Sequence, residues 1–142
     1  MLRIEEIERL LDENQRLLIL DTEDPEGAVA WFQDLDRSTG RACYRWVARD
    51  GLRRLSADHI QIPETFRLGD ALDYIHSRRQ FGVFLFPELG GLIKDLDIQA
   101  KIQRHVISEG EPPRIIILYG AHPTLPVRLA PLAQRFGRRR FD

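Results

Sequence analysis

Three ionisable residues stand where apolar stretches of the sequence end, a position that suits catalytic or metal-binding groups. They are Asp21, Glu88 and His122. Two carboxylates and an imidazole could bind a metal ion or carry out acid–base chemistry. They would meet if the apolar stretches are neighbouring strands of a parallel sheet, because such sheets bind ligands at the carboxyl ends of their strands. One hypothesis is therefore a small enzyme or metal-binding protein. Such residues also fall at strand ends by chance, so our main prediction names no catalytic residue.

The turn after the first apolar stretch argues against nucleotide binding. A phosphate there needs a glycine-rich turn with a lysine and a serine or threonine, so that N–H groups and an ammonium neutralise its charge. This turn instead holds Asp21, Glu23 and Asp24, followed by Pro25, and the chain contains no G-x-x-x-x-G-K-[ST] or G-x-G-x-x-G motif. Asp24 suits the N-cap of a helix and Pro25 suits its first position. We therefore expect no cofactor and a capping role for the acidic turn.

A short basic tail occupies residues 135–142. Its four arginines stand beside two phenylalanines and are Arg135, Arg138, Arg139 and Arg140. Arginines interleaved with aromatic rings could contact nucleic acid or an acidic protein surface. The net charge of −1 gives no overall field that would draw the chain to nucleic acid or to an anionic membrane. We thus treat these arginines as a possible protein-interaction surface and expect neither nucleic acid nor a membrane as partner.

The near-zero net charge hides a segregation of charge along the chain. Residues 1–36 carry three arginines against eleven acidic residues, whereas residues 37–142 carry eighteen basic residues against eleven acidic ones. Segregated charge favours contact between the two parts or contact with charged partners.

Cysteine and histidine add few candidates. Cys43 is the only cysteine, so the chain can form neither an internal disulfide nor a cysteine-based zinc site. We expect Cys43 to be a small buried apolar residue within a strand. His59, His76 and His105 have no metal-ligand spacing, and we expect them on the surface or on helix faces.

Apolar residues follow two periodicities along the chain. Helical spacing predicts helices at 3–13, about 25–40, 68–79 and 92–108. Continuous apolar runs, typical of strands buried on both faces, occupy 17–21, 42–47, 81–86 and 115–119. Weaker signals suggest a small hairpin around 60–62 in an irregular segment 52–66, a short helix within 127–136 and an edge strand at 136–141.

The alternation of helices and strands predicts the fold class. We expect an α/β domain, a three-layer sandwich with a mostly parallel sheet of four or five strands and right-handed crossovers. The 142 residues fit one domain, 1–142. No apolar run approaches the roughly 20 residues that span a bilayer, and the acidic amphipathic start differs from a secretory signal. We therefore expect a cytoplasmic protein.

Several stretches carry a family resemblance, and they are 17–26, 44–46, 51–52, 71–75, the apolar run ending at Phe86, and 114–118 with 125–126. Over about residues 4–136 the chain resembles the amino-terminal domain of the AAA-type ATPases of the hypothetical-chloroplast-reading-frame group, found in plastids, cyanobacteria and other bacteria. The resemblance implies a P-loop-NTPase-like topology, an AAA core without a phosphate-binding loop. It also implies that nucleotide chemistry belongs to a second, carboxyl-terminal ATPase module. That family is linked to regulation of photosynthesis and inorganic-carbon use in cyanobacteria.

The sequence departs from this family in two places. Residues 87–91 replace an acidic, aromatic and histidine-bearing loop, and the chain stops at Asp142 before any ATPase module. The resemblance therefore implies either a fragment of a longer ATPase or a stand-alone relative, and no catalytic residue carries over. We expect a non-catalytic domain for protein–protein interaction or assembly, with an AAA ATPase subunit or a second copy of itself as partner.

Overall fold

The computed structural model describes residues 4–12, 15–57, 59–108 and 112–137, and within these ranges it contains one sheet of six strands. The strands are β1 (Leu17–Asp21), β2 (Cys43–Val47), β3 (Gly51–Arg54), β4 (Gly82–Phe86), β5 (Arg114–Gly120) and β6 (Gln134–Gly137). Their order across the sheet is β3-β2-β4-β5-β1-β6. Every neighbouring pair is parallel except β2 and β3, which are antiparallel. The predicted α/β class with a mostly parallel sheet is confirmed, and the topology is consistent with an AAA-like core.

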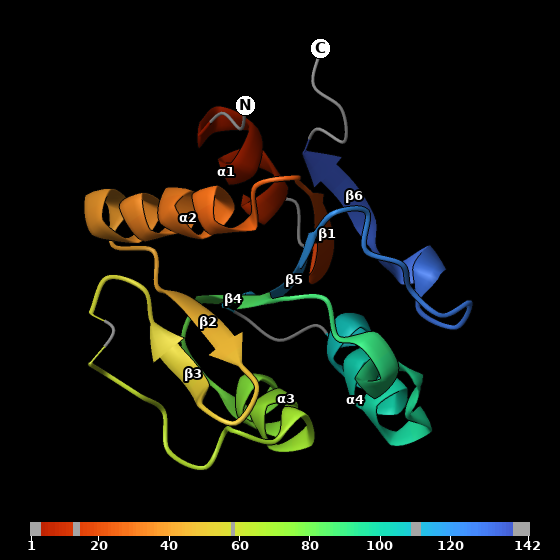
Figure 1. Ribbon diagram of the computed structural model, residues 1–142. Helices are drawn as coiled ribbons and strands as arrows, with labels where there is room; N and C mark the ends of the chain where they lie inside the picture. Colours follow the sequence, from red (N-terminus) through yellow and green to blue (C-terminus); the bar gives the residue numbers. More distant parts are fainter. Residues whose placement is uncertain (1–3, 13–14, 58, 109–111, 138–142) are drawn as a thin grey trace.

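Helices cover both faces of the sheet and complete the predicted three layers (Figure 1). The four α-helices of the described ranges are α1 (Ile4–Asp12), α2 (Pro25–Thr39), α3 (Leu68–Ser77) and α4 (Leu96–Ile107). Helices α1 and α2 lie on one face, and α3 and α4 lie on the other. Each face has its own apolar core, with Phe32 on the α2 side and Phe84 on the α3 side both fully buried. None of the described helices is long and apolar enough to cross a membrane.

The two central strands explain the apolar runs of the sequence. All five residues of β1 and all seven of β5 are buried, because helices cover both of their faces. The strands pair in parallel from Leu17 with Ile116 to Asp21 with Gly120. Their carboxyl ends therefore meet at one edge of the sheet, where the candidate site residues stand.

Local sequence signals set the ends of α2. The Asp24 carboxylate accepts a hydrogen bond from the Gly27 backbone N–H at 3.0 Å, and Pro25 is the first helical residue. At the other end Gly40 takes a left-handed conformation with φ 77°, and its N–H donates to the Asp36 carbonyl. Both ends of this helix were predicted from these residue types.

One edge of the sheet differs from the prediction. Residues 52–66 were expected to be irregular, but Gly51–Arg54 forms β3, antiparallel to β2. This short edge strand ends in two arginines, so it lacks the apolar pattern of a strand and depends on the backbone hydrogen bonds of β2. The hairpin expected around 60–62 is a single antiparallel bridge between Arg53 and Gln61. Together with β6, β3 raises the described strands to six, instead of four or five.

The predicted helix at 92–108 is divided. A 3₁₀ turn, η1 (Gly90–Lys94), comes first, and α4 begins only at Leu96. Asp95 separates them with extended backbone, and its carboxylate caps α4 by accepting from the Asp97 N–H at 2.8 Å. Aspartate favours such a capping position over a helix interior, which accounts for the break.

The end of the described chain also differs from expectation. Instead of a helix within 127–136 there is a 3₁₀ turn, η2 (Ala130–Leu132), because β6 begins directly after it at Gln134. The edge strand expected at 136–141 thus starts two residues earlier and pairs with β1 in parallel. Residues 138–141 of that prediction lie outside the described residues.

Candidate functional site

The carboxyl ends of β4, β5 and β1 lie side by side, as the hypothesis of a shared site required. Asp21 closes β1, and its carboxylate is only 2% exposed. Its Oδ1 lies 3.6 Å from His122 Nδ1, just beyond β5, and 2.6 Å from Arg135 Nη1 on β6. His122 has a positive φ of 53°, uncommon for a residue other than glycine. The structure therefore brings together two of the three predicted residues, and adds an arginine.

Arg135 of β6 forms hydrogen bonds with the end of β1 and with the segment after β5. Its guanidinium donates to Asp21 Oδ1 and, at 2.9 Å, to the Pro123 carbonyl oxygen. A buried carboxylate needs such a partner, because an unpaired charge loses its hydration without compensation. Sequence reasoning assigned this arginine to the basic tail and missed its pairing with Asp21. The other tail arginines, Arg138, Arg139 and Arg140, lie outside the described residues, so the interaction surface stays a prediction.

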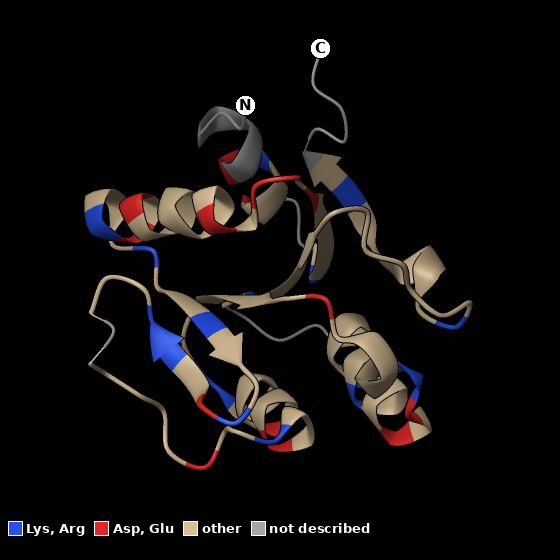
Figure 2. Cartoon of the chain, viewed as in Figure 1, with Lys and Arg blue, Asp and Glu red and all other residues tan. Residues whose placement is uncertain are grey.

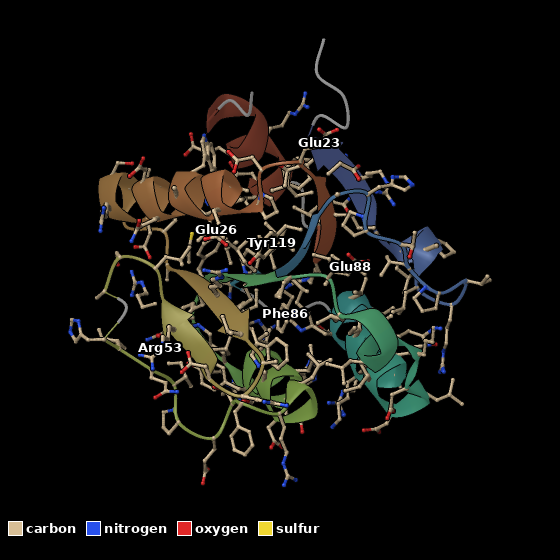
Figure 3. The ribbon with its side chains drawn as sticks, in the orientation of Figure 1. Glu23, Glu26, Arg53, Phe86, Glu88 and Tyr119 are labelled. Atoms are coloured by element: carbon tan, nitrogen blue, oxygen red, sulfur yellow. The ribbon has the colours of Figure 1, made fainter. Side chains whose placement is uncertain are left out.

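Glu88 lies at the same edge of the sheet, where its Cβ is 4.0 Å from the place that a Cβ on Gly120, the β5 residue paired with Asp21, would take. It is exposed on the segment between β4 and η1, whereas Glu23 marks the separate loop after β1 (Figure 3). Within the described ranges no group of three histidine, cysteine, aspartate or glutamate side chains could hold a metal ion. The arrangement therefore gives no support to an enzyme or metal site built from Asp21, Glu88 and His122.

The start of α2 is where a phosphate would bind if the turn after β1 were a phosphate loop. The Asp24 carboxylate already accepts the Gly27 N–H there, and a Cβ on Gly27 would overlap that carboxylate. Thr22 donates its backbone N–H to the Gly120 carbonyl at 2.8 Å, and its hydroxyl accepts from the Asp24 N–H. The loop is acidic along its length (Figure 2). A helix start filled by a carboxylate repels a phosphate instead of binding it.

A pocket of about 370 Å³ opens at the carboxyl ends of β4 and β5, and we call it the edge pocket. Its apolar wall consists of Leu89, Ile93, Leu118, Pro123, Leu125 and Pro126. Gln99 of α4 lines it as well, is 6% exposed, and donates its side-chain amide to the Ile93 carbonyl at 3.0 Å. The Gln99 side-chain oxygen has no hydrogen-bond partner among the described residues. Exposed Glu88 and Lys94 complete the lining with opposite charges.

The chain matches the family model of the SpoVK-like AAA ATPase N-terminal domain over residues 3–136. It belongs to this family. No curated protein and no solved structure was found to match the chain. The membership confirms an AAA ATPase amino-terminal domain, while the narrower hypothetical-chloroplast-reading-frame group stays a prediction.

A polar network missed by sequence reasoning crosses the sheet of this SpoVK-like domain beneath α2. Arg45 of β2 donates from Nε to the Tyr119 hydroxyl at 3.1 Å and from Nη2 to Glu26 Oε2 at 3.0 Å. Figure 3 shows Tyr119 and Glu26 on either side of the gap between sheet and helix. Burial raises the pKa of Tyr119, so its hydroxyl stays protonated. The network fixes the start of α2 to the sheet, and its only sequence signal is a lone arginine inside an apolar strand.

Two residues of the SpoVK-like domain to which the sequence assigned no functional role have shifted pKa values. Cys43 is buried as predicted, and burial, with Asp36 nearby, raises the pKa of its thiol to about 12. His105 lies on the inner face of α4 at 1% exposure, and its Nε2 is 2.6 Å from the Arg114 carbonyl oxygen. Burial lowers the pKa of His105 to about 4. Both groups are therefore neutral near pH 7.

Proposed function

We propose that this SpoVK-like N-terminal domain is a non-catalytic, AAA-like module for protein–protein assembly, accessory to an AAA ATPase or part of one. The filled start of α2 is the observation that carries the proposal. Asp24 takes the backbone donor that a phosphate would need, and Glu23 and Glu26 add negative charge around it. A domain of this family without a phosphate cradle is best suited to act through its surfaces.

The partner in this proposal is a AAA ATPase module or a second copy of the chain. Two features support it: an edge pocket that is largely apolar, and exposed side chains of both charges beside it. Apolar pockets rimmed by polar residues commonly mark interaction sites. The narrower membership in the hypothetical-chloroplast-reading-frame group, with its regulatory role, is part of the same proposal.

Nucleotide titration tests the non-catalytic part of the proposal. Isothermal calorimetry with Mg–ATP and Mg–ADP is expected to give no saturable heat. A SpoVK-like ATPase module with an intact phosphate loop serves as the positive control. Saturable binding by the wild-type chain would overturn the non-catalytic assignment.

Capture by an ATPase module tests the assembly part. An immobilised SpoVK-like ATPase module is expected to retain the chain. Because the chain itself is expected to bind no nucleotide, retention should occur both with and without Mg–ATP. Absence of retention, together with a chain that does not associate with itself, would contradict the assembly function.

A further inference from the structure

The loop between β3 and α3 presents an aromatic side chain to solvent on a rigid base. Phe66 is 51% exposed, with the Arg67 guanidinium 5.7 Å from its ring centre. Thr65, just before it, is 2% exposed. The Thr65 carbonyl accepts from Trp46 Nε1 at 2.8 Å, and its hydroxyl accepts from the Leu52 N–H at 3.0 Å. Because Thr65 is fixed, ordering Phe66 in a contact costs little entropy.

The residues around Phe66 provide further recognition groups, and we call residues 64–68 the knob. Glu64 is exposed and has a φ of 61°, a strained conformation of the kind that collects at functional segments. Helix α3 begins at Leu68, with Asp70 in its first turn, and no side-chain hydrogen bond from the described residues caps its start. Its first N–H groups are therefore open donors at the positive end of the helix dipole. The knob offers an acid, an aromatic ring and an uncapped helix end in sequence.

The edge pocket has the complementary chemistry. Its apolar wall suits an aromatic ring, and the buried Gln99 provides a side-chain oxygen for a donor. Glu88 is a carboxylate that an uncapped helix start attracts, and Lys94 is a cation that Glu64 attracts. Neither Glu88 nor Lys94 forms an ion pair within the described part of the chain.

The knob cannot fill the pocket of its own chain. It follows β3, at one edge of the sheet, whereas the edge pocket lies at the ends of β4 and β5, near η1 and the segment that leads to β6 (Figure 1). The hydrogen bonds of Thr65 hold the knob in place, so it cannot cross the sheet. A complementary pair of surfaces that one molecule cannot join within itself fits two copies.

We propose that the edge pocket binds the knob of a second copy of this chain. The Phe66 ring enters the apolar pocket, Glu88 caps the start of the partner's α3, and Lys94 pairs with the partner's Glu64. The contact is head-to-tail, so a pair of copies leaves the pocket of one copy and the knob of the other unoccupied. Further copies can add there, and the assembly can close into a ring or extend. This proposal rests on the assembly function and names its surfaces.

Mixing two complementary variants tests the contact. Phe66→Ser removes the aromatic anchor, and Leu125→Arg places a charge in the pocket. Sedimentation velocity of the wild-type chain is expected to show mass rising with concentration, and each variant alone should associate at least about tenfold more weakly. Mixed together, the two should form a complex of only two chains, since one supplies an intact pocket and the other an intact knob. Ile107→Ser, at an exposed residue of α4, is the matched control and should behave as wild type.

A charge exchange gives a second readout. Glu64→Lys alone and Lys94→Glu alone should each weaken association, and the double variant should recover most of it. Folded variants that associate like wild type, or a mixture that stays monomeric, would overturn the proposal. A wild-type chain that is monomeric at every concentration would overturn it too, but retention by the ATPase module would then still support the assembly function.

Discussion

Asp21 links the edge strand β6 to the rest of the sheet through Arg135. Its carboxylate is 2% exposed, and the guanidinium of Arg135 approaches it to 2.6 Å. Arg135 is itself about one-third exposed, so water screens part of the pair. The pair holds the edge strand β6 against β1, and it explains why an acid that could have been catalytic acts in this structure as an anchor.

Replacing Arg135 should expose this role. Arg135→Gln is expected to lower the free energy of unfolding by about 3 kcal/mol, because it leaves the Asp21 carboxylate buried without its cation. Urea denaturation followed by circular dichroism measures the loss. The double variant Asp21→Asn/Arg135→Gln should recover part of it, and a single variant as stable as wild type would contradict the anchoring role.

The burial of His105 predicts a pH dependence of stability. Its pKa is about 4 in the folded chain against 6.5 for the free group, so the unfolded chain binds the proton more tightly. The contribution of neutral His105 to the free energy of unfolding is therefore complete above pH 6.5. It is lost as the pH falls from 6.5 towards 4, by up to about 3 kcal/mol. The stability difference between wild type and His105→Gln should shrink over that range. A His105→Gln profile parallel to that of the wild type would refute the assignment.

Residues with local signals were predictable and residues with distant partners were not. Asp24 was recognised as a cap because its helix follows at once in the sequence. Asp21 and Arg135 lie 114 positions apart, so only the fold pairs them. The burial of His105 has a signal in the sequence, since His105 follows Ile98 and Ile102 at helical spacing on the same face.

At the scale of elements, the start of α2 carries the functional argument. Asp24→Ala removes the cap and should lower the free energy of unfolding by about 1 kcal/mol. Thermal and urea unfolding measure the change, with the adjacent exposed residue in Glu23→Ala as the matched control, expected to have little effect. Equal losses in the two variants would show that Asp24 is not acting as the cap.

Elements were predictable where their sequence alone specified them. Strands β1 and β5 have continuous apolar runs because they are covered on both faces, and α2 has signals at both ends. Strands β3 and β6 are short edge strands whose hydrogen bonds come from β2 and β1, so their sequences carry little pattern of their own. The edge pocket was not predictable, because it arises where η1 and the segment after β5 meet.

At the scale of the whole molecule, the charge segregation of the sequence is partly used inside the fold. Arg54 pairs with the buried Asp36 at 2.8 Å, and Arg135 pairs with Asp21. Arg41 lies 3.4 Å from Asp12 of α1, and Arg45 lies 3.0 Å from Glu26 of α2. Arginines of the basic part therefore form ion pairs with the acidic part. Other acidic residues of α2 and of the loop before it, which Figure 2 colours red, remain exposed, and they are Glu23, Asp24, Glu26 and Asp34.

We propose that this SpoVK-like N-terminal domain works through contacts with other chains. Sedimentation velocity of the purified chain, alone over a concentration series and mixed with a SpoVK-like ATPase module, tests it most directly. We predict a mass above 16.5 kDa that rises with concentration, and a further complex with the module. A chain that sediments as a monomer of 16.5 kDa under every one of these conditions would contradict the claim.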